Sequence, residues 1–292
     1  MCGIFGIAVF GTWTDSPKFL NTGQLRILVK KLLELNTMRG SDAAGLAVVD
    51  ASWENINIIK RPVPGKYLIT SSLFEEFAET HIVPSNIQVI LGHTRSKTLG
   101  SQYNNKNNHP VVYENMVSVH NGYVNSHEKI FHNISSERKA EVDSEAVSAL
   151  LNQATKNDLS LDTVPNENIY DTNLRLQRNN KKFASILEEF TGSVTALAIS
   201  ADIKNKLMLM RKGNEVAIGW LPDHNIAIFS SVAAHIREAC KVINVPVYEL
   251  KVQEIENNTF SIFSLEVPNK ITKTLPPKPI VKFELKDSRN RD

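Results

Sequence analysis

Residues 1–7 read MCGIFGI, a cysteine directly after the initiator methionine and then an apolar run of strand character. A small second residue normally permits removal of Met1, which would leave Cys2 with a free α-amine. The thiolate is the reactive form of cysteine, and an ordinary thiol, with a pKa of about 8.5, is only partly ionised near neutrality. An α-amine, with a pKa of about 7.7–8, can accept the proton of its own side chain. Residue 2 could therefore supply both nucleophile and base. Taken alone, however, a cysteine at position 2 more often has no catalytic role.

Composition narrows the function classes. Of the 292 residues, 42% are apolar and 22% are charged, which is ordinary for a globular protein of one large or two small domains. The net charge is +2, from 33 basic and 31 acidic residues without a basic stripe, so no nucleic-acid partner is expected. The two cysteines, Cys2 and Cys240, are too few for a disulfide framework and do not have the spacing of zinc ligands. We therefore expect no metal and no cofactor, and a reducing, cytoplasmic setting. No signal peptide and no apolar run of membrane-spanning length is found, so no membrane partner is expected.

Short β-like runs dominate the chain, and helical stripes are grouped between them. The expected strands are residues 4–10, 45–49, 56–60, 88–91, 116–120, 194–199, 207–210, 217–220, 226–229 and 247–250. Helical spacing predicts helices over 25–35 with Thr22 as N-cap, over 147–154 after Asp143, over 183–190 before Gly192, and over 232–243 with Ser230 or Ser231 as N-cap. This grouping predicts an α+β fold rather than a parallel doubly wound sheet.

Five motifs follow one another in a fixed order: MCGIFGI at 1–7, RGSDAAG at 39–45, GHTR at 92–95, HNG at 120–122 and VDSEAV at 142–147. The series resembles the glutaminase domain of class II (N-terminal nucleophile) glutamine amidotransferases over about residues 1–265, with RKGN at 211–214 and FSS at 229–231 as later landmarks. The resemblance implies a four-layer αββα sandwich with two antiparallel sheets. It also implies hydrolysis of L-glutamine to glutamate and ammonia through a glutamyl thioester on Cys2.

Asn121 and Gly122 are the expected oxyanion site. A side-chain amide and a backbone N–H are donors of the type that stabilises a tetrahedral intermediate. The alternative is that Asn-Gly closes a β-hairpin, because both residues tolerate positive φ.

A pair of opposite charges is expected to bind the amino-acid head of glutamine. By resemblance, Arg95 would hold the α-carboxylate and Asp143 the α-ammonium group, although Asp143 could also be an ordinary helix-start carboxylate. Arg39 is expected to support the nucleophile, and Asp42 to cap a turn. After GHTR the sequence runs Ser-Lys-Thr-Leu-Gly, without the aromatic residue and histidine of many relatives, so Thr98 is the one loop residue expected to contact substrate.

The remaining segments bear on partners. Residues 266–292 are expected to be a C-terminal arm or linker, and together with the polar stretch 157–182 they are candidate docking surfaces or solvated loops. About thirty residues cannot house a synthase or ligase, and no phosphate-binding Gly-Lys-Ser/Thr loop occurs, so the ammonia is expected to pass to a separate partner protein.

Two other classes of protein stay open at this stage. One is a different N-terminal-nucleophile amidohydrolase, such as an acylase, and the Arg95–Asp143 pair argues against it. The other is a catalytically silent regulatory subunit, which retention of Met1 would favour. His109-Pro110 and Cys240 are expected to be structural.

Overall fold

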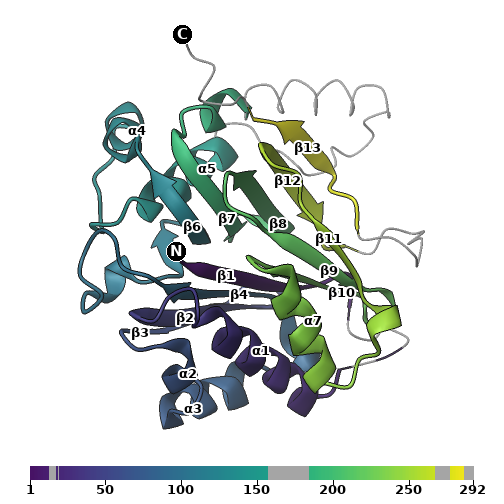
Figure 1. Cartoon of the computed structure of the whole chain (residues 1–292). Coiled ribbons are helices and arrows are strands. Elements are labelled where there is room, and N and C mark those ends of the chain that lie inside the picture. The colour runs from purple at the N-terminus through teal and green to yellow at the C-terminus, as the bar shows by residue number, and fades with distance from the viewer. Residues whose placement is uncertain (13–17, 19, 157–183, 267–276, 286–292) are drawn as a thin grey trace, which may run out of the picture.

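Two antiparallel β-sheets stack face to face, and helices cover the outer face of each sheet (Figure 1). The computed structural model describes residues 1–12, 18, 20–156, 184–266 and 277–285. Sheet A contains, in spatial order, β11 (Lys251–Glu254), β9 (Ala217–Leu221), β10 (Ile226–Ser230), β1 (Gly3–Val9), β4 (Ile87–Arg95), β2 (Ala43–Asp50) and β3 (Ile56–Arg61). Sheet B contains β13 (Val281–Glu284), β12 (Thr259–Ser264), β8 (Ile203–Lys212), β7 (Gly192–Ser200), β6 (Met116–Val124) and β5 (Val111–Tyr113).

The helices complete a four-layer sandwich. Sheet A is covered by α1 (Thr22–Asn36), α2 (Gly65–Leu68), α3 (Ser72–His81) and α7 (Ala233–Val242), and sheet B by α4 (His127–Asn133) and α5 (Ser144–Lys156) (Figure 1). The strand pairs that the structure describes are all antiparallel. The expected α+β class with two antiparallel sheets is confirmed. None of the described helices is long and apolar enough to cross a membrane.

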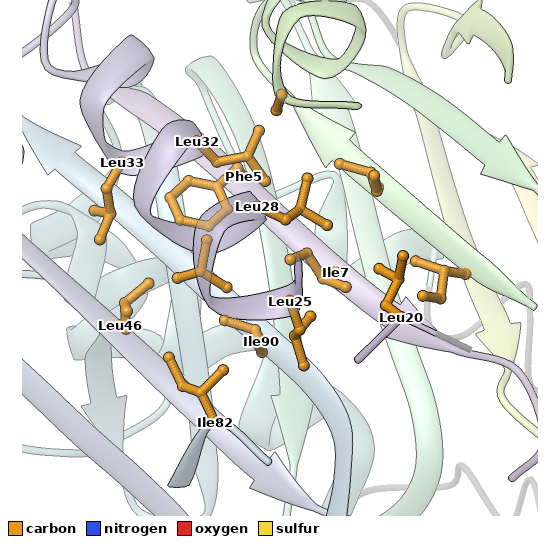
Figure 2. Close-up of a cluster of buried hydrophobic side chains, with 14 of the residues drawn as sticks. Phe5, Ile7, Leu20, Leu25, Leu28, Leu32, Leu33, Leu46, Ile82 and Ile90 are labelled. Carbon is orange, nitrogen blue, oxygen red and sulfur yellow. The ribbon is translucent and has the colours of Figure 1, made fainter. Parts of the chain in front are cut away.

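Strand β1 lies in the middle of sheet A, and its side chains alternate between the two apolar layers. Phe5 and Ile7 pack beneath α1, among the leucines that Figure 2 shows on that helix. Ile4 and Ala8 face the opposite way, into the layer between the two sheets. Because both faces are buried and both edges are paired, with β10 and β4, β1 is a rigid support for the residue that precedes it.

Helix α1 begins one residue earlier than expected. The N-cap is Asn21, not Thr22: the Asn21 side chain accepts a bond from the Gln24 backbone N–H at 2.9 Å, and the Gln24 side chain accepts one from the Asn21 N–H at 3.1 Å. This is a capping box, which satisfies two backbone donors at once. The expected Ser230 or Ser231 cap of α7 is also wrong, because the N-cap is Val232 without a side-chain bond.

The C-terminal part of the chain differs from expectation in two places. Residues 247–250 are not a strand: Val247–Glu249 is a 3₁₀ turn, in which the Glu249 N–H bonds the Pro246 carbonyl at 3.0 Å, and β11 follows it. Within the expected arm 266–292, Val281–Glu284 forms β13, which pairs with β12 at the edge of sheet B. The stretch 157–182 lies outside the described residues, as does the start of the helix expected at 183–190, of which 184–187 are helical.

Candidate active site

Cys2 lies at the start of β1, at the end of sheet A that faces β6 (Figure 1). The strand is fixed immediately beyond it, because Ser231 Oγ accepts a bond from the Ile4 N–H at 3.0 Å and donates to the Ile4 carbonyl at 3.4 Å. Ser231, expected to cap a helix, therefore anchors the first strand instead. The Cys2 side chain is half-buried, and its Sγ lies 3.4 Å from the backbone N of Ser96 and 3.6 Å from the Ser96 carbonyl oxygen.

Burial and nearby charges shift the pKa of the Cys2 thiol. Burial raises the pKa of the Cys2 thiol, while the Ser96 N–H, the positive amino terminus and Arg95 lower that pKa, and the Asp143 carboxylate raises it; the net shift is upward. Ser96, whose backbone contacts the thiol, directly follows Arg95 in the chain, and the charge of Asp143 acts on the same thiol with the opposite sign. With Met1 in place, Cys2 is therefore a protonated thiol near neutral pH.

Arg39 follows α1 and bonds the backbone of the nucleophile. Its Nε donates to the Cys2 carbonyl at 3.0 Å. The carbonyl is held by a charged donor, which makes the bond stronger than a neutral one. Arg39 thus contacts the backbone of Cys2, and its role in supporting the nucleophile stays a prediction.

Asn121 and Gly122 lie within β6, opposite Thr195 and Val194 of β7, so the alternative of a hairpin turn is wrong. The Asn121 side chain is 1% exposed, and neither its oxygen nor its nitrogen has a hydrogen-bond partner among the described residues. A buried polar group without a partner costs about 1–3 kcal/mol, so it calls for an explanation, and a free donor kept for a bound substrate is one. The Asn121 backbone is held separately, by the Asn214 side chain, which donates to its carbonyl at 3.3 Å.

His93 joins the two sheets next to Asn121. It lies opposite Ile4 in the β1–β4 register, and its Nε2 is 3.0 Å from the carbonyl oxygen of His120, the residue before Asn121. The segment of β6 that carries Asn121 is therefore held against the part of sheet A that contains the beginning of β1.

Gly122 has a φ of +149°, and a Cβ there would lie 1.9 Å from the Ser193 carbonyl oxygen. Gly122→Ala is therefore expected to lower the free energy of unfolding by about 3 kcal/mol, through left-handed strain and overpacking. Urea denaturation measures the change. Gly23→Ala, on the exposed side of α1, is the matched control and is expected to lack this loss.

Arg95 ends β4 and is 3% exposed. Its Nη1 donates to Asn108 Oδ1 at 2.9 Å, and its Nη2 donates to the carbonyls of Gly100, at 2.9 Å, and Leu99. Burial lowers the pKa of Arg95, whereas the Cys2 thiol in its ionised form and the carboxylates of Asp42, Asp143 and Glu141 raise it, and the net shift is downward. The guanidinium thus sits among acidic groups and already bonds the loop that follows it.

Asp143 precedes α5 and is 4% exposed. Its Oδ2 accepts a bond from the Val124 N–H at 2.7 Å, which fixes the carboxylate against the end of β6. The carboxylate therefore lies beside the strand that carries Asn121 and Gly122. Thr98, in contrast, is exposed on the loop, and no contact joins it to Cys2 or Arg95 in the described structure.

Several loop contacts were not expected from the sequence. Ser96 contributes backbone groups to the thiol, and Asp42 Oδ2 accepts a bond from the Lys97 N–H at 2.7 Å. Asp42, interpreted as a turn cap within RGSDAAG, thus holds the loop after GHTR. Asn107 and Asn108, in the Asn-rich stretch 104–108, are both fully buried. The density of asparagines before His109 is the signal that could have indicated an internally bonded loop.

Three buried histidines lie behind the site. His93 and His109 stack with their ring centroids 3.8 Å apart, and His120 Nδ1 is 2.9 Å from Ser144 Oγ. Burial lowers the pKa of all three, that of His93 to about 3. These rings are neutral at physiological pH, and His109 is part of the packing, as its structural role requires. Among the described residues no group of histidine, cysteine and acidic side chains could hold a metal ion.

The histidines predict loss of stability in acid. Below pH 6.5 the unfolded chain takes up protons that the folded rings cannot, so the free energy of unfolding falls as the pH falls. For His93 alone the loss at pH 4.5 is about 3 kcal/mol. Urea denaturation between pH 7.5 and 4.5 measures it, and His93→Gln, which cannot titrate, is expected to flatten the acid limb. An equal slope in the variant would contradict the assignment.

Comparison with known proteins supports this interpretation of the geometry. No protein-family model matches the chain. The glutamine–fructose-6-phosphate aminotransferase of Methanosarcina mazei is 27% identical over 266 residues, which cover 86% of this chain and 36% of the relative. The enzyme of the same name from Escherichia coli K12 is 32% identical over 159 residues, covering 53% of this chain and 22% of the relative. The chain thus spans roughly a third or less of the curated relatives it matches.

Solved structures share the fold at lower identity. Glutamine phosphoribosylpyrophosphate amidotransferase from B. subtilis superimposes with a TM-score of 0.55 at 16% identity, over 90% of this chain and 47% of that one. A structure described as the allosteric regulatory enzyme of purine biosynthesis gives a TM-score of 0.56, also at 16% identity and with the same coverage. The chain is thus similar in sequence to glutamine–fructose-6-phosphate aminotransferases, and it shares the fold of these two solved structures over 90% of its length.

Proposed function

We propose that the chain hydrolyses L-glutamine to glutamate and ammonia, with Cys2 as the nucleophile after removal of Met1. One observation carries the proposal: the thiol of Cys2 lies 3.4 Å from the backbone N of Ser96, the residue after the buried Arg95, and the charges of Arg95 and of the buried Asp143 act on its pKa in opposite directions. A cation and an anion beside one thiol match the α-carboxylate and the α-ammonium group of a free amino acid.

The chemistry follows from these positions. The α-amine of Cys2 accepts the thiol proton, and the thiolate attacks the side-chain amide carbon of glutamine. The Asn121 side-chain N–H and the Gly122 backbone N–H stabilise the negative oxygen that forms. The amine then returns its proton to the leaving nitrogen, ammonia departs, and a glutamyl thioester remains on Cys2. Water cleaves the thioester, which releases glutamate and restores the thiol.

The test requires protein in which Cys2 is the first residue, confirmed by intact mass. Glutamate and ammonia are then measured separately with L-glutamine as substrate, and acid quenching during turnover captures the thioester for mass spectrometry. Equal release of both products supports the proposal. Release of amine from acylated amines but not from free glutamine would indicate a different amidohydrolase, and no turnover of either would indicate a silent subunit.

We further propose that the ammonia is used by a separate synthase or ligase protein. The support is that the curated relatives are named for an amino transfer from glutamine to fructose 6-phosphate, a reaction that consumes the nitrogen of glutamine. A synthase or ligase that serves as acceptor should use glutamine in place of added ammonium salt only when this protein is present. A candidate that uses glutamine equally well without this chain is not the partner.

A further inference from the structure

The loop of residues 96–108, between β4 and β5, begins at the Cys2 thiol and is held by side chains at both of its ends. At its start, Ser96 touches the Cys2 thiol and the Lys97 N–H bonds Asp42. Arg95 donates to carbonyls within the loop, using three of its five N–H groups on Leu99, Gly100 and Asn108. The position of the loop therefore decides both the access to the thiol and the direction of the guanidinium.

Glu141 and Asn107 bond each other in both directions. Glu141 Oε2 accepts from Asn107 Nδ2 at 2.7 Å, and Asn107 Oδ1 accepts from the Glu141 N–H at 2.9 Å. The same oxygen of Glu141 accepts from the Ser101 N–H at 3.2 Å, and Asn107 Nδ2 also donates to the Ser101 carbonyl at 3.0 Å. These bonds join the two ends of the loop turn 101–107 to one carboxylate.

Gly100 shows how closely the loop packs on this pair. Its φ is +68°, and a Cβ there would lie 2.7 Å from Asn107 Nδ2 and 3.0 Å from Glu141 Cβ. The carbonyl of Gly100 is one of the two that Arg95 bonds. A shift of the Glu141–Asn107 pair would therefore displace an acceptor of the guanidinium.

Glu141 also lies two residues before Asp143 along the chain. The pair thus connects the segment that carries Asp143 to the loop that holds Arg95. These two charges are the ones proposed to bind opposite ends of glutamine, so the distance between them depends on the pair.

We infer that Glu141 and Asn107 are positioning residues for the substrate: they hold the loop 96–108 over Cys2 and set Arg95 in place relative to Asp143. The inference rests on the proposed glutaminase function for its kinetic part only. The contact of the loop with the thiol is a property of the structure, and access to the thiol can be measured without any substrate.

The first experiment measures alkylation of Cys2 by iodoacetamide, resolved by mass spectrometry. Glu141→Ala, Glu141→Gln and Asn107→Ala are compared with Glu137→Ala, an exposed glutamate four residues away that serves as control. The two alanine variants at the pair are expected to react roughly tenfold faster at Cys2, the size expected for loss of a hydrogen bond to a charged group. Cys240, whose pKa burial raises to about 12, is the unreactive internal reference.

The second experiment measures steady-state glutamine hydrolysis by the same proteins. KM for glutamine is expected to rise roughly tenfold in Glu141→Ala while kcat changes less than about threefold, because binding geometry and not the nucleophile is altered. Glu141→Gln keeps an acceptor oxygen at an exposed position and is expected to restore part of the loss in both assays. Glu137→Ala is expected to match the parent protein.

The outcomes separate the two proposals. Folded pair variants with parent rates of Cys2 alkylation, or with parent KM in an active enzyme, would overturn the inference. If the parent protein hydrolyses no glutamine but Cys2 is alkylated faster in the pair variants than in the parent, the glutaminase function is refuted and the role of the pair in holding the loop stands. A variant with lower kcat and lower thermal stability but an unchanged KM would show that the pair has only a structural role, which would overturn the inference.

Discussion

Replacing Cys2 by alanine is expected to abolish glutamine hydrolysis, with a loss of about 10⁴-fold or more, because no other group can form the thioester. The fold is expected to survive. The Cys2 side chain is only half-buried, and among the described residues its sulfur makes hydrogen-bond contacts only with Ser96, at 3.4 and 3.6 Å. Strand β1 is held by its neighbours β4 and β10 and by Ser231, none of which needs the sulfur.

Cys240→Ala is the matched control for this variant. Cys240 is the second free cysteine of the chain and lies buried on α7. Its removal is expected to cost about 1 kcal/mol of stability without altering glutamine turnover at a temperature where the protein is folded. The measurements are ammonia release and urea denaturation of both variants. Parent activity in Cys2→Ala would exclude Cys2 as the nucleophile.

Protein that retains a residue before Cys2 is expected to lose about 10²- to 10⁴-fold in kcat, the range of a positioned general base. An extended chain turns the Cys2 nitrogen into an amide, which cannot accept a proton near neutral pH. Burial raises the pKa of the thiol with Met1 attached, so the missing base is not replaced by spontaneous ionisation.

Two preparations of one sequence test this expectation. In one, a protease removes an N-terminal fusion and leaves Cys2 first; in the other, a single extra glycine stays in front of Cys2. Turnover, intact mass and thermal unfolding are measured on both. Similar unfolding with a large difference in kcat is expected, and similar kcat would assign the proton transfer to a group other than the α-amine.

The sequence predicts the centre of the fold well, because the information is local. Alternation along 4–10 places Phe5 and Ile7 on one face and Ile4 and Ala8 on the other, as the structure has them. The helix after Asp143 follows from its apolar stripe and is found as α5. The helices α3 and α4 and the strands β12 and β13 are not among the expected elements, because they are only ten, seven, six and four residues long and each shows a short pattern.

In the candidate site, too, the residues within sequence motifs can be predicted, whereas the contacts between residues distant in the chain cannot. Cys2, Arg95, Asp143 and the Asn121-Gly122 pair lie in motifs that the sequence displays, and their shared role in substrate binding stays a prediction. The bond between Asn107 and Glu141 joins residues 34 positions apart in the chain, and no local pattern indicates such a pairing. The same holds for the two bonds of the Ser231 hydroxyl to the Ile4 backbone, which span 227 positions.

The central placement of β1 has a consequence for how this domain could be re-engineered. The proposed nucleophile, Cys2, directly precedes β1, a strand hydrogen-bonded to a neighbour on each side, and the backbone amides of β1 are expected to exchange with solvent among the slowest in the molecule. The proposed substrate recognition depends in part on the loop 96–108, which side chains hold in place. Libraries randomised within 97–106 can therefore search for new amino-acid substrates while the nucleophile keeps its register.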